Sequence, residues 1–249
     1  NTTRSLYERN DVIIVASVSC IYGLGLPESY FKGTIKVSVG DTLERNDLIK
    51  HLVMTQYTRN DLVLERSTFR ARGDILEIMP AYEKIITRIY FFGDEVEKIV
   101  RIDNLTGEIL EAPESVMIYP AVHYIAYDEN EDETISMIRT ELKNRVAELE
   151  SQNKILESQR LQQRVKYDIE MIKEMGYCSG IENYSRIIER RPVGSAPATL
   201  LDYFRGDFLT VIDESHVTIP QLNGMYHGDA SRKNTLVEFG FRLPCAKDN

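Results

Sequence analysis

The chain has 249 residues and a formal net charge of -9, with 43% hydrophobic and 28% charged residues. These values are ordinary for one large globular domain or two to three small ones, and they exclude wholesale disorder. No apolar run approaches ~18 residues, which predicts no transmembrane helix. The three cysteines, Cys20, Cys178 and Cys245, are widely spaced, form no disulfide framework and favour a reducing cytoplasm. Because the chain does not begin with Met, we interpret it as part of a longer protein.

The first half of the chain predicts strands. Residues 12–16 are a continuous, mostly β-branched run, typical of a strand buried on both faces of a parallel sheet. Between about 33 and 125, short apolar patterns alternate with turn residues, which predicts a mainly antiparallel α+β domain. One helix is expected at 47–56, with Leu48, Leu52 and Val53 on one face. The strands expected are 35–39, 62–65, 68–72, 75–79, 86–92 and 96–102, with turns at Gly73-Asp74, Gly93-Asp94 and Thr106-Gly107.

The second half predicts helices followed by another α/β piece. Residues 129–175 contain no Gly or Pro, and their apolar positions recur every three or four residues. We expect two antiparallel helices with a break near residues 151–153 and an end at Gly176; a coiled-coil arm is the alternative. A short helix is expected at 199–204 and a buried strand at 208–212.

The run Asp213-Glu214-Ser215-His216 follows that expected strand and has the form of a Walker B or helicase motif II. In this interpretation Asp213 holds Mg²⁺ through water, Glu214 orients the attacking water, and His216 couples the site to a neighbouring domain or to DNA. A nucleotide site also needs a G-x-x-x-x-G-K-[ST] phosphate loop, and the sequence has none. Either the motif is accidental or the phosphate loop lies upstream of residue 1.

Longer ordered strings identify a resemblance. The chain resembles the UvrB family of the bacterial UvrABC excinuclease through residues 16–25, 68–74, 91–95, 167–185, 213–216, 220–222 and 240–244. The resemblance implies an α/β fold in which a RecA-like P-loop helicase domain, residues 1–31 and 199–249, is interrupted twice. The interruptions are an α+β UvrA-docking domain, 32–125, and a helical insertion that clamps DNA, 126–198.

The resemblance also implies a function. It predicts an ATP-dependent and Mg²⁺-dependent component of nucleotide excision repair that UvrA loads on damaged DNA and that hands over to the UvrC nuclease. The chain alone is expected to lack ATPase activity. Two alternatives stay open: a non-enzymatic adaptor that binds UvrA, and a relative of the transcription-repair coupling factor.

The site residues implied by the resemblance fall into two further groups. The UvrA-docking candidates are Arg59, Arg70 and Arg72, with Glu77 and Glu95 as weaker ones; Arg70 and Arg72 share one face of a strand. The DNA-contact candidates are Tyr124, Arg160, Arg164, Lys166, Tyr177, Cys178, Glu182, Asn183 and Tyr184. Residues 160–191 carry seven Lys and Arg against five Asp and Glu, whereas 128–157 carry four against nine, which favours the first segment as the DNA side. For each residue the alternative is a solvated surface or a place in the core.

Overall fold

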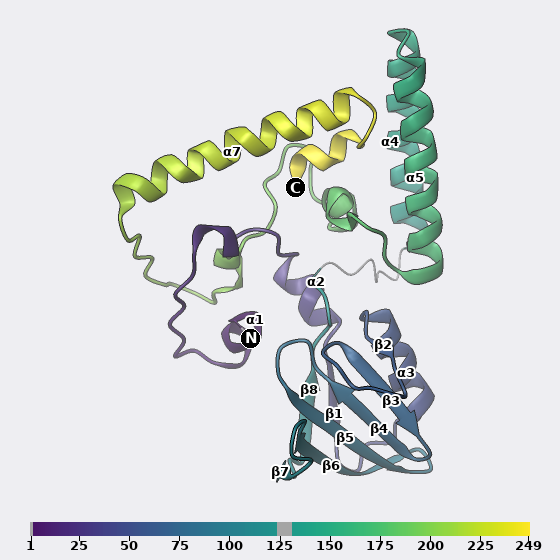
Figure 1. The fold of residues 1–249 in the computed structure, drawn as a ribbon, viewed down its shortest axis with the longest axis vertical. Helices are drawn as coiled ribbons and strands as arrows, with labels where there is room; N and C mark the ends of the chain where they lie inside the picture. Colours follow the sequence, from purple (N-terminus) through teal and green to yellow (C-terminus); the bar gives the residue numbers. More distant parts are fainter. Residues whose placement is uncertain (1, 124–130) are drawn as a thin grey trace. The chain divides into compact units, whose positions relative to one another are not determined.

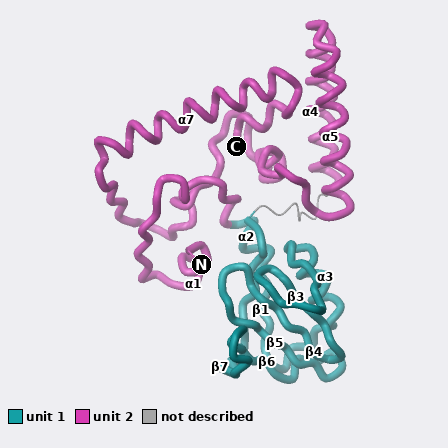
Figure 2. Tube along the Cα trace, in the orientation of Figure 1, with its two compact units in different colours: residues 1, 28–127 teal, residues 2–27, 128–249 magenta. Residues whose placement is uncertain are grey.

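The computed structural model describes residues 2–123 and 131–249, which form two compact units (Figures 1 and 2). Of the described residues, unit 1 contains 28–123 and unit 2 contains 2–27 and 131–249. Tyr124, one of the predicted DNA contacts, lies outside the described residues. No helix in the described part of the chain is long and apolar enough to cross a membrane.

Unit 1 is built on a six-stranded sheet with the strand order β2-β3-β4-β5-β6-β7 (Figure 1). Its strands are β2 (Thr58–Arg59), β3 (Thr68–Arg72), β4 (Ile75–Met79), β5 (Ile85–Phe92), β6 (Glu95–Asp103) and β7 (Ile109–Glu111). All neighbours are antiparallel except β2 and β3. A separate antiparallel pair joins β1 (Ile35–Ser38) to β8 (Ser115–Ile118), and the helices are α2 (Pro27–Lys32) and α3 (Arg45–Met54).

The two faces of this sheet differ, as strand alternation requires. One face contributes Phe69, Leu76 and Ile89 to the main core, where Leu48 and Leu52 of α3 pack against them. The other face is mixed. It carries a row of charged side chains across β3, β4 and β5, and a smaller apolar cluster of Leu64, Ile86, Val100 and Ile102.

Most of the elements predicted for unit 1 are confirmed. Strands β3 and β4 have the predicted bounds, and β1, β5, β6 and α3 differ by one or two residues at an end. The predicted strand at 62–65 is wrong: Asn60 Oδ1 accepts the N–H groups of Leu62 and Val63 at 3.1 Å each, so the backbone turns there. Val53 faces solvent rather than the core. The short strands β2, β7 and β8 have little pattern of their own and were not predicted.

Unit 2 contains the helical hairpin of α4 (Glu131–Ser151) and α5 (Ile155–Met175), as predicted. Asn153, with φ 59°, makes the tight turn between them, and Gly176 ends α5 in the left-handed conformation while its N–H donates to the Ile172 carbonyl. Ile138, Leu142, Leu161 and other buried side chains fill the seam between the helices. The apolar stripes are therefore satisfied within the chain, in contrast to the coiled-coil alternative.

The two predicted parallel strands of unit 2 are wrong. Residues 12–16 and 208–212 are irregular, and Ile13, Val15, Leu209 and Val211 are each more than four-fifths exposed. A buried parallel strand needs strands on both sides to satisfy its backbone groups, and none of the described residues pairs with either segment. The RecA-like domain is therefore not formed by the described residues.

The segments close in sequence to residues 12–16 and 208–212 nevertheless contact each other. The short helix predicted at 199–204 is the 3₁₀ helix η3 (Leu200–Tyr203). It lies against the N-terminal residues, where Leu200 N–H donates to the Ile21 carbonyl at 2.8 Å and Tyr203 Oη to the Gly25 carbonyl at 2.9 Å. The other elements here are α1 (Thr2–Glu8), η1 (Val18–Cys20), η2 (Ile181–Tyr184), α6 (Ser185–Ile188), α7 (Ser215–Glu238) and η4 (Pro244–Asp248).

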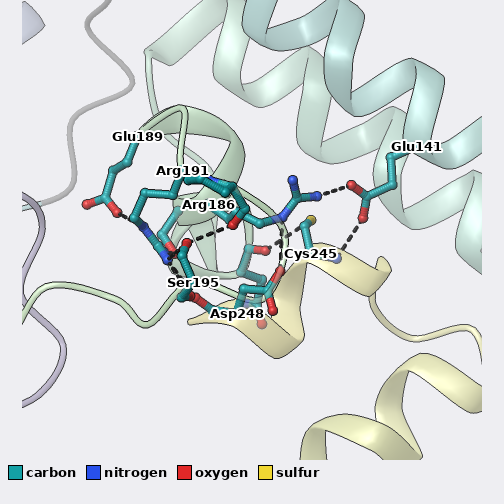
Figure 3. A network of polar contacts seen from close by, with 10 residues as sticks. Glu141, Arg186, Glu189, Arg191, Ser195, Cys245 and Asp248 are labelled. Carbon is teal, nitrogen blue, oxygen red and sulfur yellow. Dashed lines mark hydrogen bonds and ion pairs between the residues drawn. The ribbon is translucent and has the colours of Figure 1, made fainter.

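A buried polar network fastens the C-terminal segment of the chain to the helical hairpin (Figure 3). The Arg186 guanidinium pairs with Glu141 of α4 and with Asp248 of η4, and Glu141 also accepts the Cys245 N–H at 2.6 Å. Arg191 donates to the carbonyls of Ser195 and Asp248 at 2.9 and 3.0 Å. Segments more than 50 residues apart in sequence are thus held by charged hydrogen bonds, which are stronger than neutral ones.

Candidate functional site

The central feature of the charged sheet face is an Arg–Glu–Arg row. Arg70 of β3, Glu77 of β4 and Arg88 of β5 are directly opposite one another in the register. Glu77 Oε2 accepts a hydrogen bond from Arg70, and Glu77 Oε1 lies 2.7 Å from Arg88 Nη2. Glu77 is 5% exposed, whereas the guanidinium groups reach solvent. The carboxylate therefore holds two cations side by side at the surface.

Burial by itself raises the pKa of Glu77, but the hydrogen bonds from Arg70 and Arg88 outweigh it and the pKa lies below its ordinary value. Glu77 therefore stays ionised at neutral pH. Because it is buried, it positions the arginines and does not itself reach a partner, which corrects its predicted place in the interface.

A second acidic residue, Asp61, organises the other two arginines. Asp61 lies 3.0 Å from Arg59 Nε and accepts the Ala71 N–H, while its carbonyl accepts from Arg72 at 2.5 Å. The hydrogen bond from the Ala71 N–H is the main cause that lowers the pKa of Asp61. Arg72 lies two residues after Arg70 on β3 and bonds Asp61, so this group adjoins the Arg70 row. Arg59 and Arg72 thus both contact Asp61, and Arg70 and Arg72 share one face of β3. Their role in docking stays a prediction.

Two residues of this region depart from the sequence prediction. Glu95 begins β6, which β4 and β5 separate from β3, so the structure does not place it with the arginines. Arg88 was missed, although residues 85–92 give a signal: it is a charged side chain on an otherwise uncharged strand. We call Arg59, Arg70, Arg72 and Arg88 the arginine patch.

The second candidate region is the end of α5 and the loop after it. Asp168 Oδ2 accepts hydrogen bonds from Arg164 Nε at 3.0 Å and from Tyr184 Oη at 2.7 Å. Arg164 Nη2 also donates to the Ser179 carbonyl at 2.7 Å. These bonds fix the loop of residues 177–184 onto the helix.

Two predicted DNA contacts in this loop are corrected by burial. Cys178 is 0% exposed, and burial raises the pKa of its thiol to about 12. Tyr184 is also buried, with its hydroxyl on Asp168. Both side chains hold the loop in shape and neither is available to a nucleic acid in this structure. Residue type alone does not show that the Tyr184 ring and the Cys178 thiol are buried rather than exposed.

The remaining candidates on this side lie at the surface. Lys166, Tyr177 and Glu182 are exposed, and Asn183 Nδ2 donates to the Gly180 carbonyl at 2.7 Å. Arg160 donates to the Phe239 carbonyl at 2.6 Å and its guanidinium lies 4.3 Å from the centre of the Phe241 ring. Tyr167 was missed: it is 55% exposed and lines a shallow depression with Arg160, Arg164 and Lys166.

The predicted nucleotide motif lies on an exposed turn before α7. Glu214 has φ 45° and its N–H donates to Asp213 Oδ1 at 2.9 Å, while His216 Nδ1 lies 3.3 Å from Glu214 Oε2. The carboxylates do not stand at the tip of a strand. Among residues 2–123 and 131–249, no three His, Cys, Asp or Glu side chains converge as metal ligands. Asp213 and Glu214 thus do not have the strand-end placement that the sequence predicts for them, and the motif's role with Mg²⁺ and ATP stays a prediction.

Comparison with known proteins agrees with this division of the chain. Residues 35–124 match the model of the UvrB interaction domain, and residues 129–190 match that of the UvrB third helical domain. The whole chain is 54% identical to the UvrABC system protein B of Gloeobacter violaceus and 55% identical to that of Mycobacterium tuberculosis. It is 56% identical to that of Geobacillus kaustophilus. The chain spans 37%, 35% and 38% of these relatives' lengths, respectively.

Proposed function

The chain carries the UvrB interaction domain and the UvrB third helical domain and so belongs to the UvrB family, and from this premise we propose that it is a docking and DNA-contacting part of a nucleotide excision repair protein. Unit 1 binds UvrA through the arginine patch. Unit 2 contacts damaged DNA through the exposed side chains near the end of α5.

The arginine patch carries the proposal for unit 1. Four guanidinium groups lie around only two carboxylates, Glu77 and Asp61, on a chain whose net charge is -9. Both carboxylates are engaged from within the chain, so the patch keeps an excess of positive charge. A partner surface rich in carboxylates complements it, and planar guanidinium groups suit bidentate pairing.

An apolar element adjoins the patch. Leu62 is 87% exposed and Val63 is 54% exposed, yet their loop is held by Asn60 and by the contacts of Asp61. A fixed loop that presents a leucine loses little conformational entropy on binding. We propose that Leu62 and Val63 form the apolar part of the UvrA-docking surface.

The test is a titration of the chain with purified UvrA. Arg70→Glu with Arg72→Glu changes the local charge and should weaken binding by at least tenfold. The matched variant Lys36→Glu with Lys84→Glu makes the same change in net charge at exposed lysines of unit 1 and should bind like the wild type. Equal affinity for all three chains would refute the docking role, provided that circular dichroism shows each variant folded.

For the intact protein we propose that UvrA loads it on damaged DNA, that it depends on ATP and Mg²⁺, and that it hands over to UvrC. The match of residues 129–190 to the third helical domain favours this assignment over a relative of the transcription-repair coupling factor. The chain by itself is better described as a non-enzymatic adaptor, because Asp213 and Glu214 are exposed on a turn.

A further inference from the structure

A second basic surface lies along the helical hairpin of unit 2. A groove between α4 and α5 is lined by Arg139 and Lys143 from α4 and by Lys166 and Lys173 from α5. Leu142 and Ile169 form part of its apolar floor, and Glu170 is its acidic lining residue. The groove therefore has four positive charges and one negative charge among its lining residues. This differs from residues 128–157 as a whole, where acidic residues outnumber basic ones.

The four cations have no acidic partner within the described chain. None of Arg139, Lys143, Lys166 and Lys173 takes part in an ion pair with another described residue. On the opposite flank of α4, by contrast, Arg145 pairs with Glu148 and Glu141 pairs with Arg186. All four side chains are exposed, so the positive field of this unpaired set reaches solvent and attracts anions.

The spacing of these cations suits a chain of anions better than a single one. Arg139 and Lys143 are one helical turn apart, about 6 Å along the axis, and Lys166 and Lys173 are about 10.5 Å apart. The two helices run side by side and antiparallel (Figure 1), and all four cations line the groove between them. A small anion would meet only part of this set, whereas an extended polyanion would meet all of it.

The basic surface continues around α5 to an aromatic ring. The depression that contains Arg160, Arg164 and Tyr167 shares Lys166 and Glu170 with the groove. An exposed tyrosine beside cations is a platform on which a base can stack whatever its identity. This neighbour favours a nucleic acid over an acidic protein segment.

We propose that the groove formed by Arg139, Lys143, Lys166 and Lys173 binds the phosphodiester backbone of a DNA strand, which continues over Tyr167. The proposal rests on the proposed function only in taking DNA as the polyanion. It adds a phosphate-binding track on α4, where sequence patterns indicated no candidate, to the contacts near the end of α5.

The test measures binding of a fluorescent single-stranded oligonucleotide to the whole chain at salt concentrations between about 50 and 200 mM. The variant Arg139→Gln, Lys143→Gln, Lys173→Gln removes three charges from the groove while keeping good helix formers. A matched variant, Lys36→Gln, Lys84→Gln, Lys98→Gln, removes three charges from exposed lysines of unit 1. Each phosphate contact contributes about 0.7 to the salt slope for a single strand, so the groove variant should lower the slope by about 2.

Equal slopes for the two variants would overturn the proposal, as would absence of DNA binding by the wild-type chain at the lowest salt. A further arm uses Tyr167→Ala with Arg160→Gln. If that variant weakens DNA binding while the groove variant does not, the proposed function of unit 2 stands and the groove assignment fails. Competition by polyglutamate as effective as that by unlabelled oligonucleotide would also overturn it, since the groove would then select carboxylates equally well.

Discussion

Glu77 and Arg88 face each other on strands β4 and β5, where Glu77 Oε1 accepts from Arg88 Nε at 2.9 Å and lies 2.7 Å from Nη2. Arg70 binds the other carboxylate oxygen of Glu77 from β3. One buried carboxylate thus sets the spacing of two surface arginines. It connects the stability of unit 1 to the surface that we propose for docking, because the same ion pairs serve both.

The first prediction concerns the stability of unit 1. Glu77→Gln removes the charge that holds Arg70 and Arg88 together and leaves two guanidinium groups without their carboxylate. We expect β3, β4 and β5 to lose about 1–3 kcal/mol of stability, measured as faster amide hydrogen exchange. The control Glu97→Gln, at an exposed position on β6, should change exchange little. Equal amide protection of these strands in Glu77→Gln and Glu97→Gln would show that the Arg70–Glu77–Arg88 row contributes nothing to their stability.

The second prediction is a pH dependence with a defined sign. The folded pKa of Glu77 lies below the ordinary value of 4.5, so its contribution to stability is fully present above that value. The contribution is lost as the pH falls through the folded pKa. We therefore compare the amide hydrogen-exchange protection of β4 in the wild type and in Glu77→Gln between neutral pH and about pH 3. Protection should fall more steeply with decreasing pH in the wild type. Parallel pH profiles would contradict the assignment.

Local sequence patterns account for much of unit 1 and for the helical hairpin. Residues 68–79 and 129–176 combine a clear period with turn residues, and a hairpin or a helix is stabilised largely by neighbours in sequence. The arginines at 70 and 72 could be placed on one strand face for the same reason. Asp61, which contacts Arg59 and Arg72, could not be placed in this way, because the apolar pattern of residues 62–65 next to it predicts a strand where the structure has a loop.

The failures concern features that need distant partners. Residues 12–16 and 208–212 have the composition of buried strands, but a strand forms only where other strands pair with it. The network around Arg186 joins residues 141, 186 and 248, which no local pattern relates. The groove on α4 was missed because Arg139 and Lys143 lie in a stretch whose summed charge is negative, although one face of the helix is basic.

The third prediction concerns the cysteines. Cys20 is exposed, whereas Cys178 and Cys245 are buried and burial raises the pKa of both thiols. Since the thiolate is the reactive form, a thiol reagent at about pH 8 should modify Cys20 rapidly and the other two only on unfolding. Peptide mass spectrometry identifies the modified sites, and Cys20→Ser should remove the rapid phase. Rapid modification of Cys178 would contradict the closed loop at residues 177–184.

The fourth prediction compares two glycines. Gly240 has φ 70°, and a Cβ there would overlap the Glu157 carbonyl of α5, whereas a Cβ on Gly228 within α7 meets nothing within 4 Å. Gly240→Ala should therefore destabilise unit 2 by about 1–3 kcal/mol. Gly228→Ala should stabilise α7 by about 0.5–1 kcal/mol. Thermal unfolding of both variants tests the contrast, and a shift of the same sign in both would show that Gly240 does not fit closely against α5.

The last prediction concerns catalysis by the chain alone. Asp213 and Glu214 are exposed on a turn, and the sequence contains no phosphate loop of the G-x-x-x-x-G-K-[ST] form. We therefore expect no ATP hydrolysis above background in a phosphate-release assay with Mg²⁺. Glu214→Gln is the informative control: it should match the wild-type chain in this assay and in circular dichroism. Turnover by the wild type that Glu214→Gln abolishes would mean that this turn forms a working nucleotide site.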